Sequence, residues 1–331
     1  MDYQKINNKK VLVTGGAGFI GSNLCESLLA NNNEVICLDN FSTGRMQNIE
    51  PFLNNNKFTL ITGDICNLSD CDKAMIDVDI VLQQAALGSV PRSINDPIKT
   101  NEVNIGGFLN VLVSARNANV KRVVFAASSS TYGDSETLPK VEEIIGKPLS
   151  PYAVTKYVNE LYAHVFALNY GMDIIGLRYF NVYGKNQDSN GAYAAVIPKF
   201  TMQLMSMQSP VINGDGTNSR DFTYIENVVQ MNHLAATTTN PLAKGEVFNT
   251  AVGERADLNM LTNLLKKYLA EYDNKIGDVA ITYGNERSGD IPHSLASIDK
   301  AKNILGYNPS HNLQAGLKEA VDWYWKNLNG K

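Results

Sequence analysis

Short apolar runs alternate with longer stretches of helical spacing between residue 11 and residue 249. Runs of this kind, bounded by turn residues, are typical of buried strands, and the stretches between them of helices. Because helices connect consecutive strands, the pattern predicts a parallel sheet that is covered on both faces. The expected strands are residues 11–14, 34–38, 57–61, 79–82, 122–127, 173–177 and 246–249.

The helix that follows residue 150 can be predicted together with both of its ends. Ser150 can cap the free amides of a helix start, Pro151 fits the first helical position, and Gly171 offers a stop. Tyr152 and Lys156 are four residues apart, so their side chains lie on one face of this helix. Apolar residues recur with a helical period at Val154, Tyr157, Val158, Leu161, Tyr162, Val165 and Phe166.

The composition of the chain changes after Asn181. Residues 183–221, and the chain from about residue 253 onward, are richer in Gly, Asn, Gln and Met. We therefore expect an α/β fold with two parts. Residues 1–182 and 222–252 would form a doubly wound parallel sheet, and residues 183–221 and 253–331 a smaller α/β lobe for the substrate. Ligands bind beyond the carboxyl ends of the strands in such sheets, where Asp64, Ala85, Ser128 and Asn181 fall.

The overall composition excludes several classes of protein. With 331 residues, 44% hydrophobic and 19% charged, the chain is an ordinary globular protein, and its net charge of -4 gives no reason to expect nucleic acid as a partner. No apolar run reaches the roughly 20 residues that span a membrane, and the N-terminus lacks a signal-peptide core, so we expect a cytoplasmic protein. The four Cys and four His residues lack metal-ligand spacing, so we expect reduced thiols and no metal.

A glycine-rich loop follows the first predicted strand. Gly15, Gly18 and Gly21 lie between that strand and a helical pattern, which is the context of a dinucleotide-binding loop in a Rossmann-type sheet. The glycines permit a tight turn and close approach of the backbone to a pyrophosphate at the helix N-terminus. Asp39 ends the second strand, 18 residues beyond Gly21, where a carboxylate binds ribose hydroxyls and repels a 2′-phosphate. The pair favours NAD over NADP, although Asp39 and Asn40 could also form a simple turn.

Tyr152 and Lys156 are candidates for general acid–base chemistry. Tyrosine has a reference pKa of about 10, and lowering it by about 3 units takes ~4 kcal/mol of stabilisation of the phenolate. A lysine held close in a desolvated site, helped by another positive charge, could supply this. Ser128 follows the fifth predicted strand and could relay a proton toward the phenolate. A packed tyrosine, a solvated lysine and a turn-forming serine would give the same residues, but their combination with the glycine loop favours a catalytic site.

At this level of detail the chain resembles the extended short-chain dehydrogenase/reductases, and specifically the nucleotide-sugar 4-epimerases. The matching motifs cover nearly the whole chain in the order of that family. They are residues 14–21 (TGGAGFIG), 39–44 (DNFSTG), 63–65 (GDI), 128–133 (SSSTYG), 152–156 (YAVTK), 178–181 (RYFN), 213–216 (NGDG), 220–222 (RDF) and 287–290 (RSGD).

The resemblance implies a mechanism. Tyr152 would accept the proton of the sugar 4-hydroxyl, Ser128 would bond to the same oxygen, and Lys156 would hold the nicotinamide ribose. Hydride would pass from C4 to tightly bound NAD and return to the opposite face of a 4-keto sugar, without net redox change. The implied cofactor-binding residues are Gly15, Gly18, Phe19, Ile20, Gly21, Asp39, Asn40, Ser42, Gly44, Asp64, Ile65, Gln84, Ala85, Ala86, Tyr152, Lys156, Tyr179 and Val182.

The resemblance also implies a UDP-sugar substrate. Arg220 and Arg287 match ligands of the diphosphate, for which the planar guanidinium fork is suited, and Asp290 matches a ligand of the uridine ribose. The residues that match the family's contacts with the uridine nucleotide and the sugar are Gln187, Ala195, Val196 and Asn213. Those that match the surroundings of the sugar are Gly88, Ser89, Ser128, Ser129, Ser130, Tyr152 and Asn181.

A gate position in this family separates enzymes that accept N-acetylated sugars from those that do not. It is Ser294 here, four residues after Asp290, and a small residue leaves room for an acetamido group. The segment 84–94 is also similar to the subgroup that prefers UDP-GlcNAc and UDP-GalNAc, so we expect that preference. The alternative is that a small residue at this gate position permits acetamido groups without any preference for them.

Other activities share this fold. UDP-glucose/UDP-galactose and UDP-glucuronate 4-epimerases or a glucuronate decarboxylase are alternatives, and a non-catalytic NAD-sensing protein is one of a different class. A 4,6-dehydratase needs an adjacent acid and base where this chain has Ser129 and Ser130. The family forms a homodimer through a four-helix interface, which would use the helices near residues 100–118 and 152–169. Their apolar stripes are equally compatible with ordinary core packing.

Overall fold

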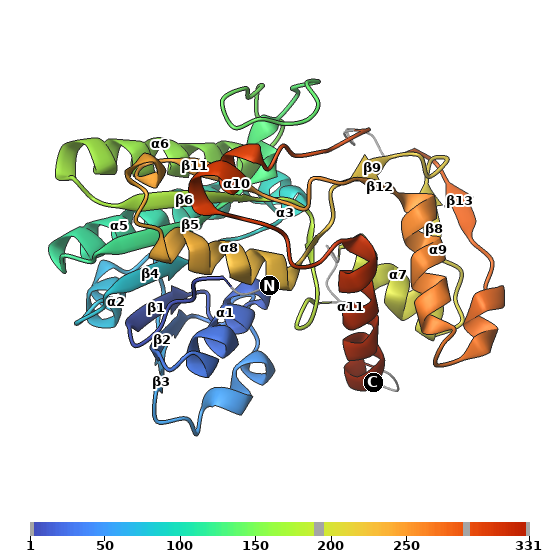
Figure 1. The fold of residues 1–331 in the computed structure, drawn as a ribbon, viewed down its shortest axis with the longest axis horizontal. Helices are drawn as coiled ribbons and strands as arrows, with labels where there is room; N and C mark the ends of the chain where they lie inside the picture. The colour runs from blue at the N-terminus through green and yellow to red at the C-terminus, as the bar shows by residue number, and fades with distance from the viewer. Residues whose placement is uncertain (1–2, 189–194, 287–291, 329–331) are drawn as a thin grey trace.

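A computed structural model describes residues 3–188, 195–286 and 292–328 of the protein (Figure 1). Its centre is a sheet of seven parallel strands in the order β11-β6-β5-β4-β1-β2-β3. All seven predicted strands form within two residues of their expected bounds, which confirms the doubly wound fold class. The strands are β1 (Lys10–Thr14), β2 (Glu34–Asp39), β3 (Phe58–Thr62), β4 (Ile80–Gln83), β5 (Arg122–Ser128), β6 (Ile174–Tyr179) and β11 (Val247–Thr250).

Helices cover both faces of this sheet. One face carries α1 (Phe19–Ala30) and α8 (Ile225–Thr237), which contact each other, and the other carries α2 (Leu68–Ala74), α5 (Phe108–Asn117) and α6 (Pro151–Tyr170). Two hydrophobic cores result, because successive strand residues point to opposite faces: Val11 and Val13 belong to the first core and Leu12 to the second.

Helix α6 has the ends that its sequence predicts. The Ser150 hydroxyl accepts a hydrogen bond from the Ala153 amide at 3.1 Å, Pro151 occupies the first turn, and Gly171 adopts a left-handed conformation with φ of 67°. The faces of this helix differ from a simple amphipathic pattern, however. Polar residues, Lys156 and Glu160 among them, are buried, whereas four apolar side chains are exposed, namely Val154, Leu161, Val165 and Leu168.

The helix expected from residue 100 to residue 119 forms in three parts. It begins as α4 (Pro97–Asn101), passes through a π-helical turn (Glu102–Gly107) and continues as α5. Within this turn, Asn104 accepts a hydrogen bond from the Leu87 amide at 2.8 Å and donates one to the Thr155 hydroxyl at 3.1 Å. The π-helical turn thus ties the loop after β4 to the start of α6, which the helical period alone does not predict. The short helix α3 (Val90–Asn95) lies between β4 and α4.

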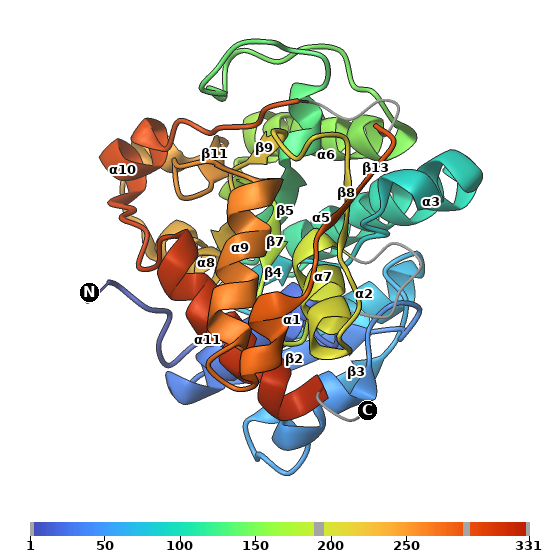
Figure 2. The same ribbon diagram turned by 90° about the vertical axis from the view of Figure 1, so that its right-hand side faces the viewer.

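The remainder of the chain supplies a second group of helices, seen at the front of Figure 2. It contains α7 (Val196–Met205), α9 (Leu258–Leu269) and α11 (Leu313–Leu328), which contact one another. Short strand pairs join it to the main sheet region. They are β7 (Val182–Tyr183) with β10 (Thr223–Tyr224), β8 (Val211–Asn213) with β13 (Thr282–Gly284), and β9 (Ser219–Arg220) with β12 (Ala256–Asp257). Helix α10 (Asp299–Leu305) packs against β11 instead.

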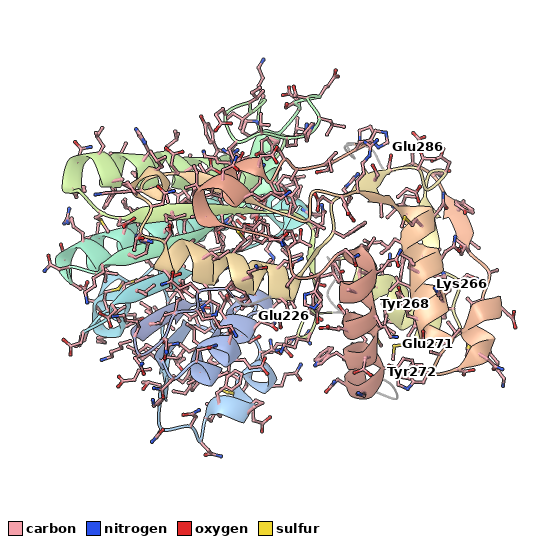
Figure 3. All side chains as sticks on the ribbon, in the orientation of Figure 1. Glu226, Lys266, Tyr268, Glu271, Tyr272 and Glu286 are labelled. Carbon is pink, nitrogen blue, oxygen red and sulfur yellow. The ribbon has the colours of Figure 1, made fainter. Side chains whose placement is uncertain are left out.

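Aromatic residues hold the second group of helices together. Figure 3 shows Tyr268 on α9 and Tyr272 just after the end of this helix, both facing α11, and the ring of Tyr272 stacks on Trp325 at a centroid distance of 5.1 Å. At the junction with the main sheet, the Tyr324 hydroxyl of α11 donates to the Gly184 carbonyl at 3.1 Å. Glu226, at the start of α8 (Figure 3), has its pKa raised by burial at this junction.

The 3-10 segments are Met46–Asn48, Glu50–Phe52, Ser129–Tyr132, Pro241–Ala243 and Asn274–Asp278. Across the described residues, no helix combines the length and apolar character needed to cross a bilayer.

Candidate active site

A cavity of about 520 Å³ opens at the carboxyl ends of the central strands. This is where a doubly wound sheet binds its ligand, and the volume is in the usual range for cofactor sites. Of the residues expected to bind the cofactor, Gly44 is the exception that does not line the cavity. Those that line it are Gly15, Gly18, Phe19, Ile20, Gly21, Asp39, Asn40, Ser42, Asp64, Ile65, Gln84, Ala85, Ala86, Tyr152, Lys156, Tyr179 and Val182.

The glycine-rich loop is packed too closely for a side chain at Gly15 or Gly21. Gly15 has a φ of 67°, and a Cβ there would lie 2.8 Å from the Ala85 backbone. A Cβ on Gly21 would lie 2.1 Å from the Gly15 carbonyl oxygen. Gly18 precedes α1 without a side-chain cap, so the free amides of the first turn remain available to a pyrophosphate. The loop therefore fits the phosphates of a dinucleotide.

Asp39 is fixed at the end of β2. Its carboxylate accepts hydrogen bonds from the amides of Ala17 at 2.9 Å and Phe41 at 2.8 Å, and burial raises its pKa. A Cβ on Gly44 would lie 2.8 Å from the same carboxylate, so Gly44 is needed for packing against Asp39. The Asn40 amide donates to Asp64 at 2.9 Å, which orients a second carboxylate on the cavity wall. This arrangement fits the adenosine half of NAD.

Three side chains meet where β5 ends and α6 begins. Ser128 is the last residue of β5, and its side chain is hydrogen-bonded to Tyr152 in the first turn of α6. The Ser130 hydroxyl donates to the Ser128 hydroxyl at 2.9 Å. The Lys156 ammonium lies 6.0 Å from the centre of the Tyr152 ring and donates to the Ala126 carbonyl at 2.7 Å. The predicted Ser–Tyr–Lys triad is thus assembled on one wall of the cavity.

Burial governs the charges of this triad. It raises the pKa of Tyr152, and the hydrogen bond with Ser128 only partly opposes this effect. It lowers the pKa of Lys156 to about 8, while the charge of Glu160 acts in the opposite direction. The sequence suggests that a neighbouring lysine lowers the pKa of the phenol, but the described residues together raise it. Formation of the Tyr152 phenolate therefore requires an additional positive charge in the site, as was expected from the sequence.

Tyr179 lines the cavity through its ring, and its hydroxyl is held from behind. The hydroxyl donates to Gln84 at 3.1 Å and accepts from the Asn232 amide at 2.9 Å. Gln84 also donates to Asn232 at 3.3 Å, so the three side chains close a hydrogen-bonded triangle. Asn232 belongs to α8, and this triangle therefore fixes two cavity walls to the helix behind them.

A second cavity of about 220 Å³ shares Asn181 with the first. Its lining includes the predicted substrate residues Val196, Asn213 and Arg220, and it contains no carboxylate among the described residues. Arg220 donates to the Pro292 carbonyl at 3.1 Å, which orients the guanidinium. A cavity with cationic walls is suited to a diphosphate.

Lys199 is a cavity residue that the sequence motifs do not identify. It projects from α7 into the lining of the second cavity and is exposed. Within the described part of the chain, no hydrogen bond or ion pair involves its ammonium. In the sequence, Lys199 is the single lysine of an otherwise apolar segment, Val196–Phe200. This position indicates a special environment and could have identified the residue.

Some predicted substrate residues lie outside the second cavity. Gln187, Gly88, Ser128, Ser129 and Tyr152 line the first cavity instead. The others do not line either cavity. Ser89 caps α3, Ser130 bonds to Ser128, Ala195 is exposed before α7, and the Ser294 amide donates to the Ser219 carbonyl at 3.0 Å. Arg287 and Asp290 lie outside the described residues.

The glycine loop, the acidic end of β2 and the Ser–Tyr–Lys triad define an extended short-chain dehydrogenase/reductase. Residues 11–251 match the model of the NAD dependent epimerase/dehydratase family. The chain belongs to this family, and its cofactor is NAD. Membership is consistent with the wall residues that fit a dinucleotide, and it confirms the resemblance found in the motifs.

The relatives cover the chain almost from end to end. A putative UDP-glucose 4-epimerase of Methanocaldococcus jannaschii is 36% identical over 96% of this chain and 99% of its own length. A UDP-N-acetylglucosamine 4-epimerase of Methanobrevibacter ruminantium, solved with UDP-N-acetylmuramic acid, is 38% identical, with a TM-score of 0.89 and coverage of 97% and 99%. A UDP-glucose 4-epimerase of Thermotoga maritima, solved with UDP-glucose, is 34% identical, with a TM-score of 0.88 and coverage of 96% and 99%.

Proposed function

We propose that the protein interconverts UDP-N-acetylglucosamine and UDP-N-acetylgalactosamine by epimerisation at C4. It is an NAD-dependent UDP-sugar 4-epimerase, and the preference for N-acetylated sugars is the finer part of the proposal. The observation that carries the reaction type is the position of the Ser128–Tyr152 hydrogen bond. It lies on the wall of the cofactor cavity, and a cavity with cationic walls adjoins that cavity through Asn181.

The triad moves a single proton in each half of the reaction. Tyr152 accepts the proton of the sugar 4-hydroxyl as the C4–H bond breaks, and it returns that proton when the bond re-forms on the other face. Ser128 binds the same oxygen and keeps it within reach of the phenol. NAD, when bound by the residues of the first cavity, would supply the hydride acceptor and donor and a positive charge. Lys156, charged at neutral pH because its pKa is about 8, adds a second positive charge behind the phenol.

The second cavity holds the nucleotide while the sugar turns. Arg220 and Lys199 lie on β9 and α7, and both contribute cationic side chains to the lining, where a diphosphate binds. Asn213 supplies a polar contact from β8. Arg287 and Asp290 complete the diphosphate and ribose contacts in this proposal. A sugar anchored through its nucleotide can present either face of C4 to the same triad.

The preference for an acetamido group is supported by small residues around the sugar. A Cβ added to Gly88 would meet no atom within 4 Å, so there is space beside this part of the cavity. Ser129 adds a hydroxyl to the wall. Ser294 lines neither cavity, and its role as the small gate residue rests on the family resemblance alone. The relative from Methanobrevibacter ruminantium carries a name with the same sugar class.

A direct test compares kcat/KM for UDP-GalNAc and UDP-Gal on the purified protein, with and without the Ser294→Tyr substitution. The unsubstituted protein should prefer UDP-GalNAc without added NAD. Ser294→Tyr should lower kcat/KM for UDP-GalNAc by about fivefold to thirtyfold, because a phenol would take up the volume of the acetamido group at a cost of about 1–2 kcal/mol. Ser206→Tyr, at an exposed position after α7, is the control.

An equal loss on both sugars would overturn the role of Ser294, and equal rates before substitution would favour a UDP-glucose/UDP-galactose 4-epimerase. Inactivity on both sugars with turnover of UDP-glucuronate would assign the carboxylated substrate instead. Tight NAD binding without turnover of any UDP-sugar would support an NAD-sensing protein. Dehydration is disfavoured because the positions of the required acid and base hold Ser129 and Ser130.

We also propose that the two parts of the chain have separate roles. Residues 1–182 and 222–252 hold NAD, and residues 183–221 and 253–331 hold the UDP-sugar. Helix α10 belongs to the second part by sequence but packs against β11, so it would act as a support of the sheet. In this proposal the cofactor cavity belongs to the first part of the chain and the second cavity to the second part. Asn181 lines both cavities.

The protein is proposed to form a homodimer through α6. Val154, Leu161, Val165 and Leu168 are exposed on this helix, and Ile98 of the adjacent α4 is 81% exposed. Exposed apolar side chains that gather on one helix face in this way mark an interaction site. Its position on the four-helix face that the family resemblance implies makes a second copy of this chain the occupant.

Leu161→Asp with Leu168→Asp should yield a monomer in light scattering after gel filtration, because each buried charge costs an apolar interface about 2 kcal/mol or more. Leu242→Asp alters an equally exposed leucine on a different surface and should leave the dimer intact. A monomeric unsubstituted protein, or a double variant that remains dimeric, would contradict the proposal.

A further inference from the structure

A buried ion pair lies directly behind Lys156. Tyr152, Lys156 and Glu160 follow one another at intervals of four residues, so they share one face of α6. Arg178 of β6 binds the Glu160 carboxylate with two parallel hydrogen bonds, Nε to Oε1 at 2.9 Å and Nη2 to Oε2 at 2.7 Å. Both side chains are almost fully buried, with 3% of Arg178 and 6% of Glu160 exposed.

The ion pair is held in place from several sides. The remaining Arg178 amine, Nη1, donates to the Glu142 carbonyl at 2.9 Å, and the guanidinium stacks 4.8 Å from the centre of the Tyr132 ring. Thr131 donates to Glu160 at 3.4 Å. The pair therefore has one defined geometry. Since apolar residues of similar size often stabilise a core equally well or better, stability alone is a weak reason for two charges at this position.

The charge that acts on Lys156 comes from Glu160 of this ion pair. Among the described residues, Glu160 is the group whose charge raises the pKa of Lys156, against the larger lowering effect of burial. On its own helix Lys156 also faces Tyr152. The other ionisable groups on the elements packed against α6 are Arg92 of α3, Lys99 of α4, Glu102 of the π-helical turn, Arg116 of α5, Arg122 of β5, Tyr132 of the 3-10 turn and Tyr179 of β6.

Most of these other groups have partners away from Lys156. Lys99 pairs with Glu102 on the surface, Arg116 stacks on Tyr170 at the far end of α6, and Arg122 pairs with Asp173 at the opposite end of its strand. The triangle with Gln84 and Asn232 holds the Tyr179 hydroxyl. Glu160 of the ion pair is thus the described charge that acts on Lys156 against the effect of burial.

We propose that Glu160 and Arg178 are positioning residues for catalysis, which hold α6 in register with β6 and keep the buried Lys156 protonated beneath Tyr152. The bidentate bond joins the catalytic helix to the strand that leads into Tyr179 and Asn181 on the cavity wall. The negative charge of Glu160 stabilises the Lys156 ammonium at a buried position where water cannot do so. The rate effects rest on the proposed epimerase function, whereas the charge state of Lys156 can be measured without it.

Glu160→Gln tests this role because it removes the anion and leaves the Arg178 cation buried. Both changes destabilise the ammonium, so the pKa of Lys156 should fall by about one to two units below that of the unsubstituted protein. Lysine is charged below its pKa, so the alkaline limb of the kcat profile should move to lower pH by a similar amount. At neutral pH kcat should fall about twofold to tenfold, the loss of charged Lys156 that this shift implies, while KM changes little because the nucleotide contacts are unaltered.

Two further variants separate charge from structure. Glu160→Gln combined with Arg178→Met removes both charges, and it should move the alkaline limb part of the way back. Glu160→Asp keeps the carboxylate and should retain an alkaline limb close to that of the unsubstituted protein, even if its kcat is lower. Asp173→Asn is the matched control, because it breaks the ion pair (2.5 Å) between Arg122 at the start of β5 and Asp173 just before β6, away from Lys156. Asp173→Asn should lower the melting temperature without moving the alkaline limb of the kcat profile.

The decisive measurement is the pKa of Lys156 itself, read from the ¹³Cε shift of labelled lysine and assigned by the loss of its signal in Lys156→Met. A pKa that is the same in Glu160→Gln as in the unsubstituted protein would overturn the proposal. A uniform drop of kcat at every pH, matched by Asp173→Asn, would reduce the pair to a structural role. If Glu160→Gln does not fold, the double variant and Glu160→Asp decide. Absence of epimerase activity in the unsubstituted protein would refute the proposed function alone.

Discussion

Tyr152→Phe should lower kcat by about 10²–10⁴-fold, the contribution that a positioned acid–base group makes to a proton transfer. The substitution removes a single oxygen, the one that is hydrogen-bonded to Ser128 and placed to accept the substrate proton. The half-buried ring stays in its position, so the cavity should keep its shape. Bound NAD should therefore remain at the level of the unsubstituted protein, and KM should change far less than kcat.

Steady-state rates and the amount of nucleotide released on denaturation measure the two halves of this prediction. Tyr157→Phe removes a phenol oxygen from the same helix at a position that does not line the cavity, and it serves as the control. Activity close to that of the unsubstituted protein in Tyr152→Phe would remove Tyr152 from its role. Loss of NAD together with activity would instead mean that the phenol is needed for the structure of the site.

Gly21→Ala should abolish the retention of NAD. The new methyl group would lie 2.1 Å from the Gly15 carbonyl oxygen and 2.7 Å from the Gly16 Cα, and backbone atoms cannot swing aside as a flexible side chain can. Relieving such overpacking costs about 1–3 kcal/mol, and the cost falls on the loop that holds the pyrophosphate. A loss of about 3 kcal/mol weakens binding more than a hundredfold, so the protein should purify without its cofactor.

Nucleotide content after gel filtration, together with activity restored by a large excess of NAD, measures this effect. The control is Gly106→Ala, because a methyl group at Gly106 would meet no atom within 4 Å. Gly106 lies in the π-helical turn and does not line the cavity. Normal cofactor content in Gly21→Ala would show that the loop can shift, and it would weaken the assignment of these glycines to the pyrophosphate.

Much of this architecture could be predicted from local chemistry. The strands are apolar runs between turns, and all seven form. The ends of α6 depend only on Ser150, Pro151 and Gly171, whose preferences act within one turn of the chain, and each adopts its expected conformation. The glycine loop and Ser128 follow strands, and parallel strands bring their ends to one edge. The cofactor residues of the motifs, Gly44 excepted, therefore line one cavity.

The remainder depended on contacts that no local pattern contains. The period of apolar residues along α6 marks a coherent face, but which face is buried depends on the partner of the helix. The structure buries Lys156, Asn159 and Glu160 and exposes Val154, Leu161 and Val165, because the buried face meets a polar cluster around Arg178. The same holds for the pKa of Tyr152, whose direction is decided by burial rather than by the adjacent lysine.

Individual positions in the substrate region show the same limit. Gln187 lines the first cavity although it was expected in the grip on the nucleotide, since the short strand pair of β7 and β10 places the following loop there. Lys199 enters the second cavity because α7 packs against α9 and α11. The π-helical turn at Asn104 has the same apolar spacing as an ordinary helix over so few residues, and only its contacts with Leu87 and Thr155 distinguish it.

Helix α6 leaves little room for neutral evolutionary drift. Most surface helices have one constrained side and one side on which substitutions accumulate freely. In α6 the inward side carries Tyr152, Lys156 and Glu160, and in the proposed dimer the outward side carries Leu161 and Leu168. A change that improves solubility of the single chain would weaken assembly, and a change that improves core packing would remove the chemistry. Catalysis and subunit association are then constrained to evolve together along one segment of twenty residues.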